Sequence, residues 1–288
     1  MTASDPGSLT AAPLDRIFSA RILILAPHMD DETLACGGTM LMHPRKEDVH
    51  CIFATDGARS PAPLLPWADG VDPGLARLRQ QEARSVAASI GVPSPNLRFL
   101  GFPDGRLSSR MTELTAEIEA SVGAILPHYV FAPFRYDVHP DHTALNRAVR
   151  SALRAIAAPP TLLEYFVYHR LRFVPGGDVR RAVDGDALWT LDTAAVADAK
   201  RQALDRYVTQ TTVRYWWQER PVLTEESLSR RCAEPEFFLP AKPDAPLSEN
   251  LSLHGRKIRL AYLAARYGKP PKDRVRALLR WLLRRGAR

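Results

Sequence analysis

The sequence predicts an α/β fold of three layers, in which helices cover both faces of a mainly parallel, Rossmann-like sheet, with a C-terminal helical extension. Two observations predict this class. Short apolar runs of strand length alternate with longer segments whose apolar residues recur at helical spacing. The first run is also apolar at nearly every position, which is typical of a strand buried on both faces. A chain of 288 residues, 45% of them hydrophobic, is long enough to bury such a core.

The predicted elements follow in a regular order. Residues 21–26 are an apolar run bounded by Pro27, which predicts the first strand, and residues 33–42 predict a turn and helix. Residues 49–55 predict a second strand, because Asp56-Gly57 is a turn dipeptide. The later elements are a long loop at 60–74, helices at 75–90, 111–125 and 143–156, and strands at 97–100, 129–132 and 161–168.

The alternation fades beyond residue 192. We expect helices at 194–210 and 225–231, a Pro-rich linker at 241–247, and two basic helices at 256–267 and 273–285. We therefore divide the chain into a flexible N-terminus (1–20), a main α/β domain (21–240), and a linker with basic amphipathic helices (241–288).

The net charge of +7 is concentrated in the tail. Residues 256–288 hold 12 Lys or Arg and 1 acidic residue, a balance of +11, which leaves the rest of the chain at −4. Since the basic residues are not spread around a cleft, we expect no nucleic-acid partner. The last helix either packs its apolar stripe, which includes Leu278 and Leu282, on the domain or lies on an anionic membrane.

The sequence also bears on the cellular compartment. No basic segment followed by an apolar run opens the chain, and the longest apolar runs are too short to cross a bilayer. Three cysteines without paired spacing predict no disulfide framework. We expect a cytoplasmic protein, peripheral on the inner face of the membrane if the basic helix docks there. The first strand is not followed by Gly-x-Gly-x-x-Gly, so a dinucleotide site has no support.

Two polar clusters follow predicted strands. The first is His28-Met-Asp-Asp-Glu32, and the second is Asp137-Val-His-Pro-Asp-His142. Both fall at the carboxyl edge of the sheet, where α/β folds bind ligands. Two imidazoles and a carboxylate that leave a fourth position open are typical of a catalytic zinc site. Taken singly, each segment also fits a helix cap with an exposed acidic turn or a surface histidine.

The two clusters resemble a known family. Residues 26–32 are similar to the Ala-His-Pro-Asp-Asp-Glu signature of the PIG-L/LmbE-like zinc-dependent N-acetylglucosaminyl deacetylases, and residues 137–142 to their His-Pro-Asp-His segment. Secondary motifs agree in order over about residues 21–212: Gly37-Gly-Thr39, Thr55-Asp-Gly57, Arg79-Gln-Gln-Glu82, Leu100-Gly-Phe-Pro-Asp-Gly105 and Lys200 to Gln210. Met29 replaces the Pro of the signature, so the turn is expected to be less constrained.

The resemblance implies a role for each residue of the clusters. It implies three ligands for Zn²⁺, or for another divalent transition metal: His28, Asp31 and His142. It implies Asp30 as the general base, and His139 as the group that stabilises the oxyanion or protonates the leaving amine. Asp141 would orient one of the imidazoles from behind.

Two further residues are candidates for substrate binding. Arg79 and Glu82 share a helix face and fit a plain surface pair, whereas the family favours Arg79 in the pocket, facing the substrate or bracing a ligand. Asp104 lies in a Pro-Asp-Gly turn, and turn formation alone would also explain it. The aromatic residues at 215–217 and Phe237-Phe238 fit either a wall for stacking a sugar ring or ordinary core.

The expected function is that of a metal-dependent hydrolase that removes the N-acetyl group from an amino sugar conjugate, such as an N-acetylglucosaminyl glycoside or a natural-product precursor. The expected partner is therefore a small N-acetylated sugar. The alternatives are an amidase of a thiol conjugate, and a non-catalytic sugar-binding member of a glycan-assembly complex.

Overall fold

A computed structural model of the chain describes residues 10–11, 14–61, 73–168, 178, 180, 183–184, 187–216, 218–247 and 249–250. The basic helices expected at 256–267 and 273–285, and with them the expected contact with a membrane, lie outside the described residues, as does most of the loop at 60–74. None of the described helices combines the length and the hydropathy needed to cross a bilayer.

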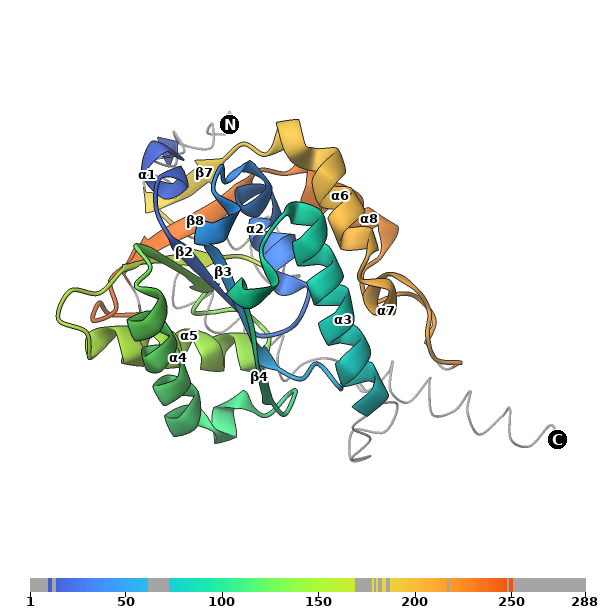
Figure 1. Cartoon of the computed structure of the whole chain (residues 1–288), viewed down its shortest axis with the longest axis horizontal. Helices are drawn as coiled ribbons and strands as arrows, with labels where there is room; N and C mark the ends of the chain where they lie inside the picture. The colour runs from blue at the N-terminus through green and yellow to red at the C-terminus, as the bar shows by residue number, and fades with distance from the viewer. Residues whose placement is uncertain are drawn as a thin grey trace, which may run out of the picture.

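Eight strands form one sheet in the order β1-β7-β8-β6-β5-β2-β3-β4 (Figure 1). Its parallel part consists of β2 (Ile22–Ala26), β3 (Val49–Thr55), β4 (Leu97–Phe102), β5 (Tyr129–Pro133) and β6 (Thr161–Tyr165). The sheet continues through β8 (Glu236–Ala241), which is antiparallel to β6, then β7 (Trp189–Leu191) and β1 (Thr10–Ala11). The mainly parallel sheet confirms the predicted fold class.

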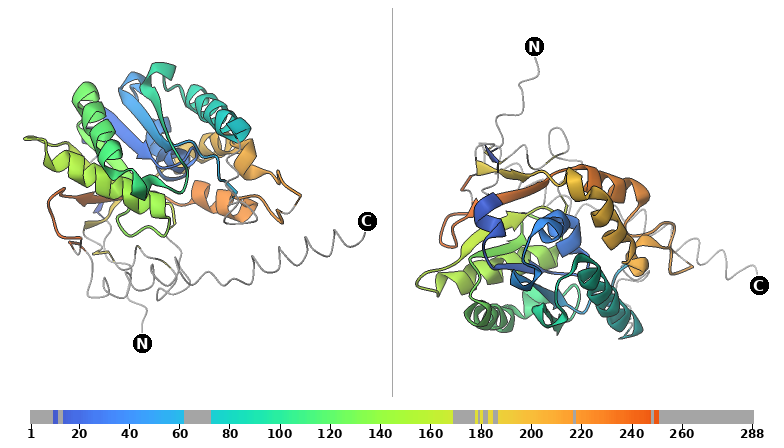
Figure 2. Two further views of the ribbon diagram at one scale, coloured as in Figure 1. Left: turned by 90° about the horizontal axis from the view of Figure 1, so that it is seen from below. Right: turned by 45° about the horizontal axis from the view of Figure 1, so that its top comes forward.

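Helices cover both faces of the sheet, and the side chains of β2 show why. Ile22 and Ile24 point to one face and Leu23 and Leu25 to the other, and all four are buried. The first face packs against α2 (Asp31–Met42), α3 (Pro73–Ile90), α6 (Ala197–Asp205) and α8 (Glu225–Ala233). The second packs against α4 (Met111–Ile125) and α5 (Pro140–Arg154), and Figure 2 shows these helices apart from α3.

Several boundaries differ from the sequence-based expectation. The helix expected at 143–156 already begins at Pro140, because His139 caps it and Pro is favoured in the first turn. The helix expected at 194–210 is divided into η7 (Ala194–Val196), α6 and α7 (Val208–Thr211), with Tyr207 buried at the break. Within residues 1–20, a short helix α1 (Leu14–Phe18) and β1 are formed. The remaining short helices are η1 (Lys46–Asp48), η2 (Ser94–Asn96) and η3 (Leu107–Ser109).

A buried ion pair anchors α2, the helix that begins at the site. Glu236 of β8 accepts hydrogen bonds from the backbone N of Gly38, at 2.6 Å, and from Nζ of Lys200, at 2.8 Å. A side chain at position 38 would clash, since a Cβ there would lie 2.2 Å from Cγ2 of Thr193. Gly38 thus lets α2 approach its neighbours closely, which fixes the position of Asp31 at its first turn.

Candidate functional site

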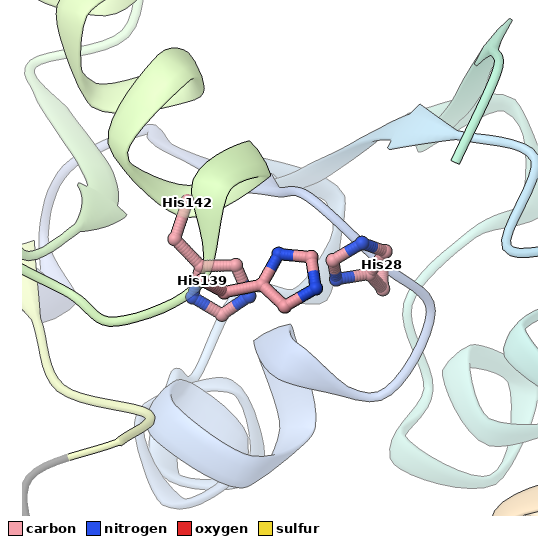
Figure 3. Close-up of side chains that lie close together, drawn as sticks. All are labelled: His28, His139 and His142. Atoms are coloured by element: carbon pink, nitrogen blue, oxygen red, sulfur yellow. The ribbon is translucent and has the colours of Figure 1, made fainter. Parts of the chain in front are cut away.

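The two polar clusters meet at the carboxyl edge of the sheet. His28 and Asp30 lie between β2 and α2, and His139 and His142 lie at the start of α5, which follows β5. Figure 3 shows the three imidazoles side by side. Their ring centroids are 4.7 Å apart for His28 and His139, 5.4 Å for His28 and His142, and 5.1 Å for His139 and His142.

Three donor atoms converge within this cluster. Oδ2 of Asp31 lies 3.2 Å from Nδ1 of His28 and 3.2 Å from Nε2 of His142. The other nitrogen of each ring faces a second carboxylate: Nε2 of His28 lies 3.3 Å from Asp141, and Nδ1 of His142 lies 3.3 Å from Asp137. Histidines that bind a metal through one nitrogen commonly hold the other against a carboxylate or carbonyl in this way. Asp31 thus lies between two imidazoles that each face a second carboxylate, and imidazole and carboxylate are the donor types of a divalent metal site.

The charges around the cluster favour a cation. His142 is fully buried, and burial would lower its pKa, but Asp137 and Asp31 raise the pKa of His142 to about 10. Burial would likewise raise the pKa of Asp31, but His142 and His28 hold it well below its ordinary value. Although both ring nitrogens of His142 lie near carboxylates, neither makes a hydrogen bond within the described part of the chain. Imidazole nitrogen and carboxylate donors of this kind suit zinc or a similar divalent metal.

Two groups of possible metal-binding atoms contain most of the residues that the sequence predicted for the site. Donor atoms of His28, His139 and His142 all lie within 4.8 Å of one another, as do those of His28, Asp104 and Asp141. Asp31 belongs to neither trio, and it meets His28 and His142 through the pairwise distances above. His28 is thus shared by the two groups.

Asp30 is held in an unusual backbone conformation. Its φ of 141° is rare for any residue except Gly. Nη2 of Arg79 donates to the carbonyl of Met29 at 2.6 Å and lies 3.3 Å from Oδ1 of Asp30, and the backbone N of Asp30 donates to Glu32 at 3.1 Å. Burial raises the pKa of Asp30 to about 7, although Arg79 opposes the shift. Such strain persists only where the surroundings enforce it, commonly at functional sites.

Met29 stabilises the turn in place of the Pro of the family signature. Its side chain is fully buried. Gly57, with a φ of 64°, leaves room for it, since a Cβ on Gly57 would lie 2.7 Å from Cε of Met29. Burial of this side chain and the hydrogen bond from Arg79 therefore constrain the turn without a Pro.

Arg79 is not part of a surface pair. It is 1% exposed, and its guanidinium donates hydrogen bonds to the carbonyls of Met29 and Gly57 and to the side chain of Asp30. Its helix neighbour Glu82 faces elsewhere and accepts hydrogen bonds from Thr209. Arg79 lies in the pocket wall, the alternative that the family favours, and its hydrogen bonds brace the segment that carries Asp30.

Asp104 and Asp141 both contact His28. Oδ1 of Asp104 lies 3.3 Å from Nε2 of His28, and Oδ2 accepts a hydrogen bond from the backbone N of Arg59. Burial would raise the pKa of Asp104, but His28 and Arg79 hold it below its ordinary value. Asp141 accepts hydrogen bonds from the backbone N of Gly105, at 2.7 Å, and from the backbone N of Leu107, at 3.1 Å. Asp104 thus does more than form its turn, and Asp141 joins the segment after β4 to His28.

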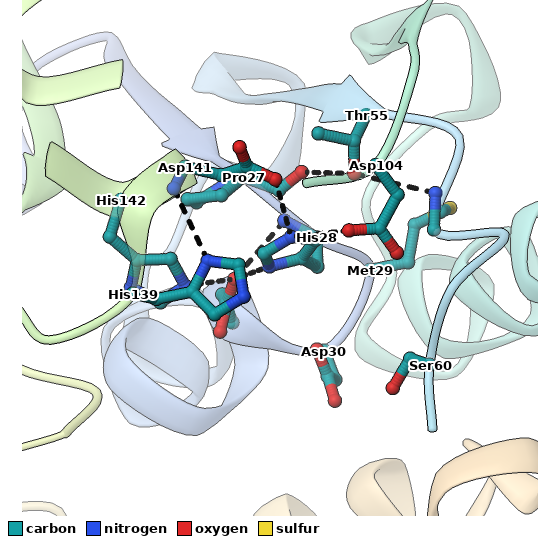
Figure 4. Close-up of polar contacts among 12 residues, drawn as sticks. Pro27, His28, Met29, Asp30, Thr55, Ser60, Asp104, His139, Asp141 and His142 are labelled. Carbon is teal, nitrogen blue, oxygen red and sulfur yellow. Dashed lines mark hydrogen bonds and ion pairs between the residues drawn. The ribbon is translucent and has the colours of Figure 1, made fainter. Parts of the chain in front are cut away.

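His139 caps the helix that follows it. Nδ1 accepts a hydrogen bond from the backbone N of Asp141 at 3.3 Å and so caps α5. In the neutral ring the proton then lies on Nε2, because Nδ1 is the acceptor. Burial, together with His28 and His142, lowers the pKa of His139 to about 4. His139 can therefore donate a hydrogen bond from Nε2 as a neutral imidazole, while its other ring nitrogen contacts Asp141 (Figure 4).

A pocket of about 290 Å³ opens beside these residues. Its wall includes residues that the sequence did not single out: Arg59, Ser60, Tyr168, Val222, Leu223, Ser227, Arg230 and Arg231. Tyr168 ends a predicted strand, and its ring lies 5.5 Å from that of His142. Gln210, at the end of the late family motif, accepts a hydrogen bond from Ser60 at the pocket wall.

None of the described aromatic residues considered for sugar stacking, at 215–216 and 237–238, lines the pocket. Phe238 is fully buried in the core and packs edge-on against Phe131, so it cannot face a ligand. Trp216 is 56% exposed but is not among the residues that line the pocket, and Trp217 lies outside the described residues.

The remaining late motif residues brace the site from outside. The hydroxyl of Tyr207 donates to Glu32, and Thr209 donates to Glu82 through both its backbone N and its hydroxyl. Lys200 pairs with Glu236. These contacts tie α6 and α7 to the helices that follow β2 and β3.

The chain is similar to several known proteins. Residues 23–153 match the model of the PIG-L family, GlcNAc-PI de-N-acetylase. The 1D-myo-inositol 2-acetamido-2-deoxy-alpha-D-glucopyranoside deacetylase of Rhodococcus opacus is 29% identical over 264 residues, which cover 75% of this chain and 88% of that protein. The probable N-acetyl-alpha-D-glucosaminyl L-malate deacetylase 2 of Bacillus cereus is 28% identical over 193 residues, with 66% and 83% covered. The N,N'-diacetylchitobiose deacetylase of Pyrococcus horikoshii shares the fold, with a TM-score of 0.53 and 18% identity over 80% of this chain and 87% of that one.

Proposed function

The chain belongs to the PIG-L/LmbE-like family of N-acetylglucosamine deacetylases, and on this premise we propose that it is a metal-dependent hydrolase that removes the acetyl group from an N-acetylglucosaminyl conjugate. The observation that carries the proposal is the convergence of His28, Asp31 and His142 beside the buried Asp30, at the wall of an open pocket. The relatives named for inositol and malate conjugates of N-acetylglucosamine support this class of substrate.

The proposed cofactor is Zn²⁺, held by His28, Asp31 and His142. A divalent metal with three protein ligands supplies a water of lowered pKa and polarises the amide carbonyl. Asp141 and Asp137 support the two imidazoles from behind, since each carboxylate faces the nitrogen that points away from Asp31.

Asp30 is the proposed general base. Its side chain lines the pocket next to the proposed ligand Asp31, and its contact with Arg79 fixes the direction of its carboxylate. Asp30 takes the proton of the attacking water, the step for which a buried carboxylate with a raised pKa is suited. Arg79 acts as a positioning residue, because it binds the backbone before Asp30 as well as its side chain.

His139 is the proposed donor to the developing oxyanion. Because Nδ1 accepts from the helix backbone, Nε2 is left to donate towards the substrate carbonyl. The proton that Asp30 has taken from the water then passes to the leaving nitrogen as the C–N bond breaks, which completes the hydrolysis to acetate and a free amino sugar.

Release of acetate from a panel of N-acetylglucosaminides tests this function. The purified, zinc-loaded protein should release acetate and a primary amine in equal amounts, and a chelator should stop the reaction. The matched control is each glycoside without its acetyl group. A zinc-loaded protein that releases acetate from no member of the panel would contradict the proposal.

A further inference from the structure

The pocket carries more positive charge than the proposed reaction uses. Its lining includes four arginines: Arg59, Arg79, Arg230 and Arg231. Arg79 is committed to Asp30 and the turn before it. The other three come from the segment after β3 and from α8, which supply no residue of the proposed metal centre.

The guanidinium of Arg230 is weakly paired. Its Nε is buried and has no hydrogen-bond partner in the described part of the chain. Its Nη1 lies 3.6 Å from Glu226, but that carboxylate is 88% exposed, and such surface pairs contribute little. Because Nε is enclosed, it is the Nη groups of Arg230, at the pocket wall and only weakly paired with Glu226, that can donate to a ligand.

Arg231 lies beside it, among charges of both signs. Its Nη1 donates to the carbonyl of Phe166 at 3.1 Å, which orients the guanidinium without neutralising it. Burial lowers the pKa of Arg231 to about 10, with Arg180 and Arg230 adding to the shift and Glu234 opposing it. A bound anion would relieve the repulsion between the neighbouring guanidinium groups.

We propose that Arg230 and Arg231, with Arg59, bind an anionic group on the part of the substrate attached to the sugar. This inference rests on the proposed function, because it names the substrate class of the same pocket. The group is an oxygen acid, a carboxylate or a phosphate, since the planar guanidinium matches two oxygens of either. A conjugate with a hydroxy dicarboxylic acid has such a group, whereas an inositol conjugate is neutral and would leave these arginines without a partner.

Matched glycosides of N-acetylglucosamine test the proposal. One carries a neutral polyol, one a hydroxy dicarboxylic acid and one a phosphate, and kcat/KM is measured for each with the zinc-loaded protein. We expect at least one anionic glycoside to be preferred, and which one is preferred separates carboxylate from phosphate. In Arg230→Gln and in the Arg230→Gln/Arg231→Gln double variant, the anionic-to-neutral ratio of kcat/KM should fall by about tenfold or more. The exposed Arg154→Gln is the control, and its ratio should not change.

Equal kcat/KM for neutral and anionic glycosides, or an unchanged ratio in the α8 variants, would overturn the inference and leave the proposed function intact. If no glycoside is hydrolysed, the proposed function fails, and calorimetry then tests the arginines by binding alone. The inference is supported if an anionic glycoside binds more tightly than the neutral one and if this preference is lost in Arg230→Gln. Equal affinities overturn the inference.

Discussion

The imidazole of His28 lies against the carboxylate of Asp141, with 3.3 Å between Nε2 and Oδ2, although 113 residues separate the two in the chain. This contact joins the cluster after β2 to the cluster at the start of α5. It also leaves Nδ1 of His28 directed at Asp31, where the proposed metal is held.

Replacing Asp141 by Asn should weaken metal binding without removing a ligand. The neutral amide is a poorer acceptor for the N–H of His28, so zinc affinity should fall by about 10–100-fold. Competition with a chromophoric chelator measures this change. An unchanged dissociation constant for zinc, in a variant with normal thermal stability, would show that Asp141 does not support His28.

Loss of a direct ligand should have a larger effect. Wild-type protein should bind about one zinc ion per chain, and His142→Ala should lose most of it, because two ligands hold the ion far less tightly. Metal analysis after dialysis provides the measurement. His50→Ala, on β3 and outside both donor groups, is the matched control and should keep its zinc. Equal retention in both variants would refute the ligand assignment.

His139 should act on turnover more than on binding. A His139→Asn variant keeps a side-chain oxygen that can cap α5, so the helix should stay intact. If His139 donates to the oxyanion, kcat should fall by about 10²–10³-fold while KM changes little. Steady-state kinetics on one N-acetylglucosaminide separates the two constants. A normal kcat with a raised KM would make His139 a substrate-binding residue instead.

The buried pair of Lys200 and Glu236 should contribute to folding. Glu236→Gln leaves the Lys200 ammonium buried without a counter-charge, so we expect the free energy of unfolding to drop by about 3–5 kcal/mol. Urea denaturation measures the change. Glu225→Gln on the exposed start of α8 is the control and should unfold like the wild type. A similar midpoint for both variants would mean that the pair does not stabilise the fold.

Local patterns in the sequence predicted the parallel part of the fold well. The run at 21–26 and the turn at Asp56-Gly57 mark strands whose pattern is set by burial on both faces, and such patterns are readable without tertiary information. The antiparallel strand β8 was not predicted. Its segment pairs with β6 and β7, so its conformation depends on partners distant in the chain.

For the site, too, local patterns could be predicted from the sequence, whereas contacts between distant parts of the chain could not. The clusters at 28–32 and 137–142 could be placed together because both follow parallel strands. The buried role of Arg79 was only one of two alternatives, since helical spacing alone does not show what a helix face packs against. Arg230 and Arg231 carry no local signal, because a helix rich in charged residues resembles any solvated helix until its packing is known.

The central claim is that Asp30 is the base beside a metal that it does not bind. Asp30→Asn preserves the shape of the side chain and removes its ability to take a proton. The most direct measurement is the zinc content and the rate of acetate release of this one variant, each compared with wild type. The account predicts about one zinc ion per chain and a kcat at least about 10²-fold lower. A variant that loses its zinc, or one that retains both its zinc and the wild-type kcat, would contradict it.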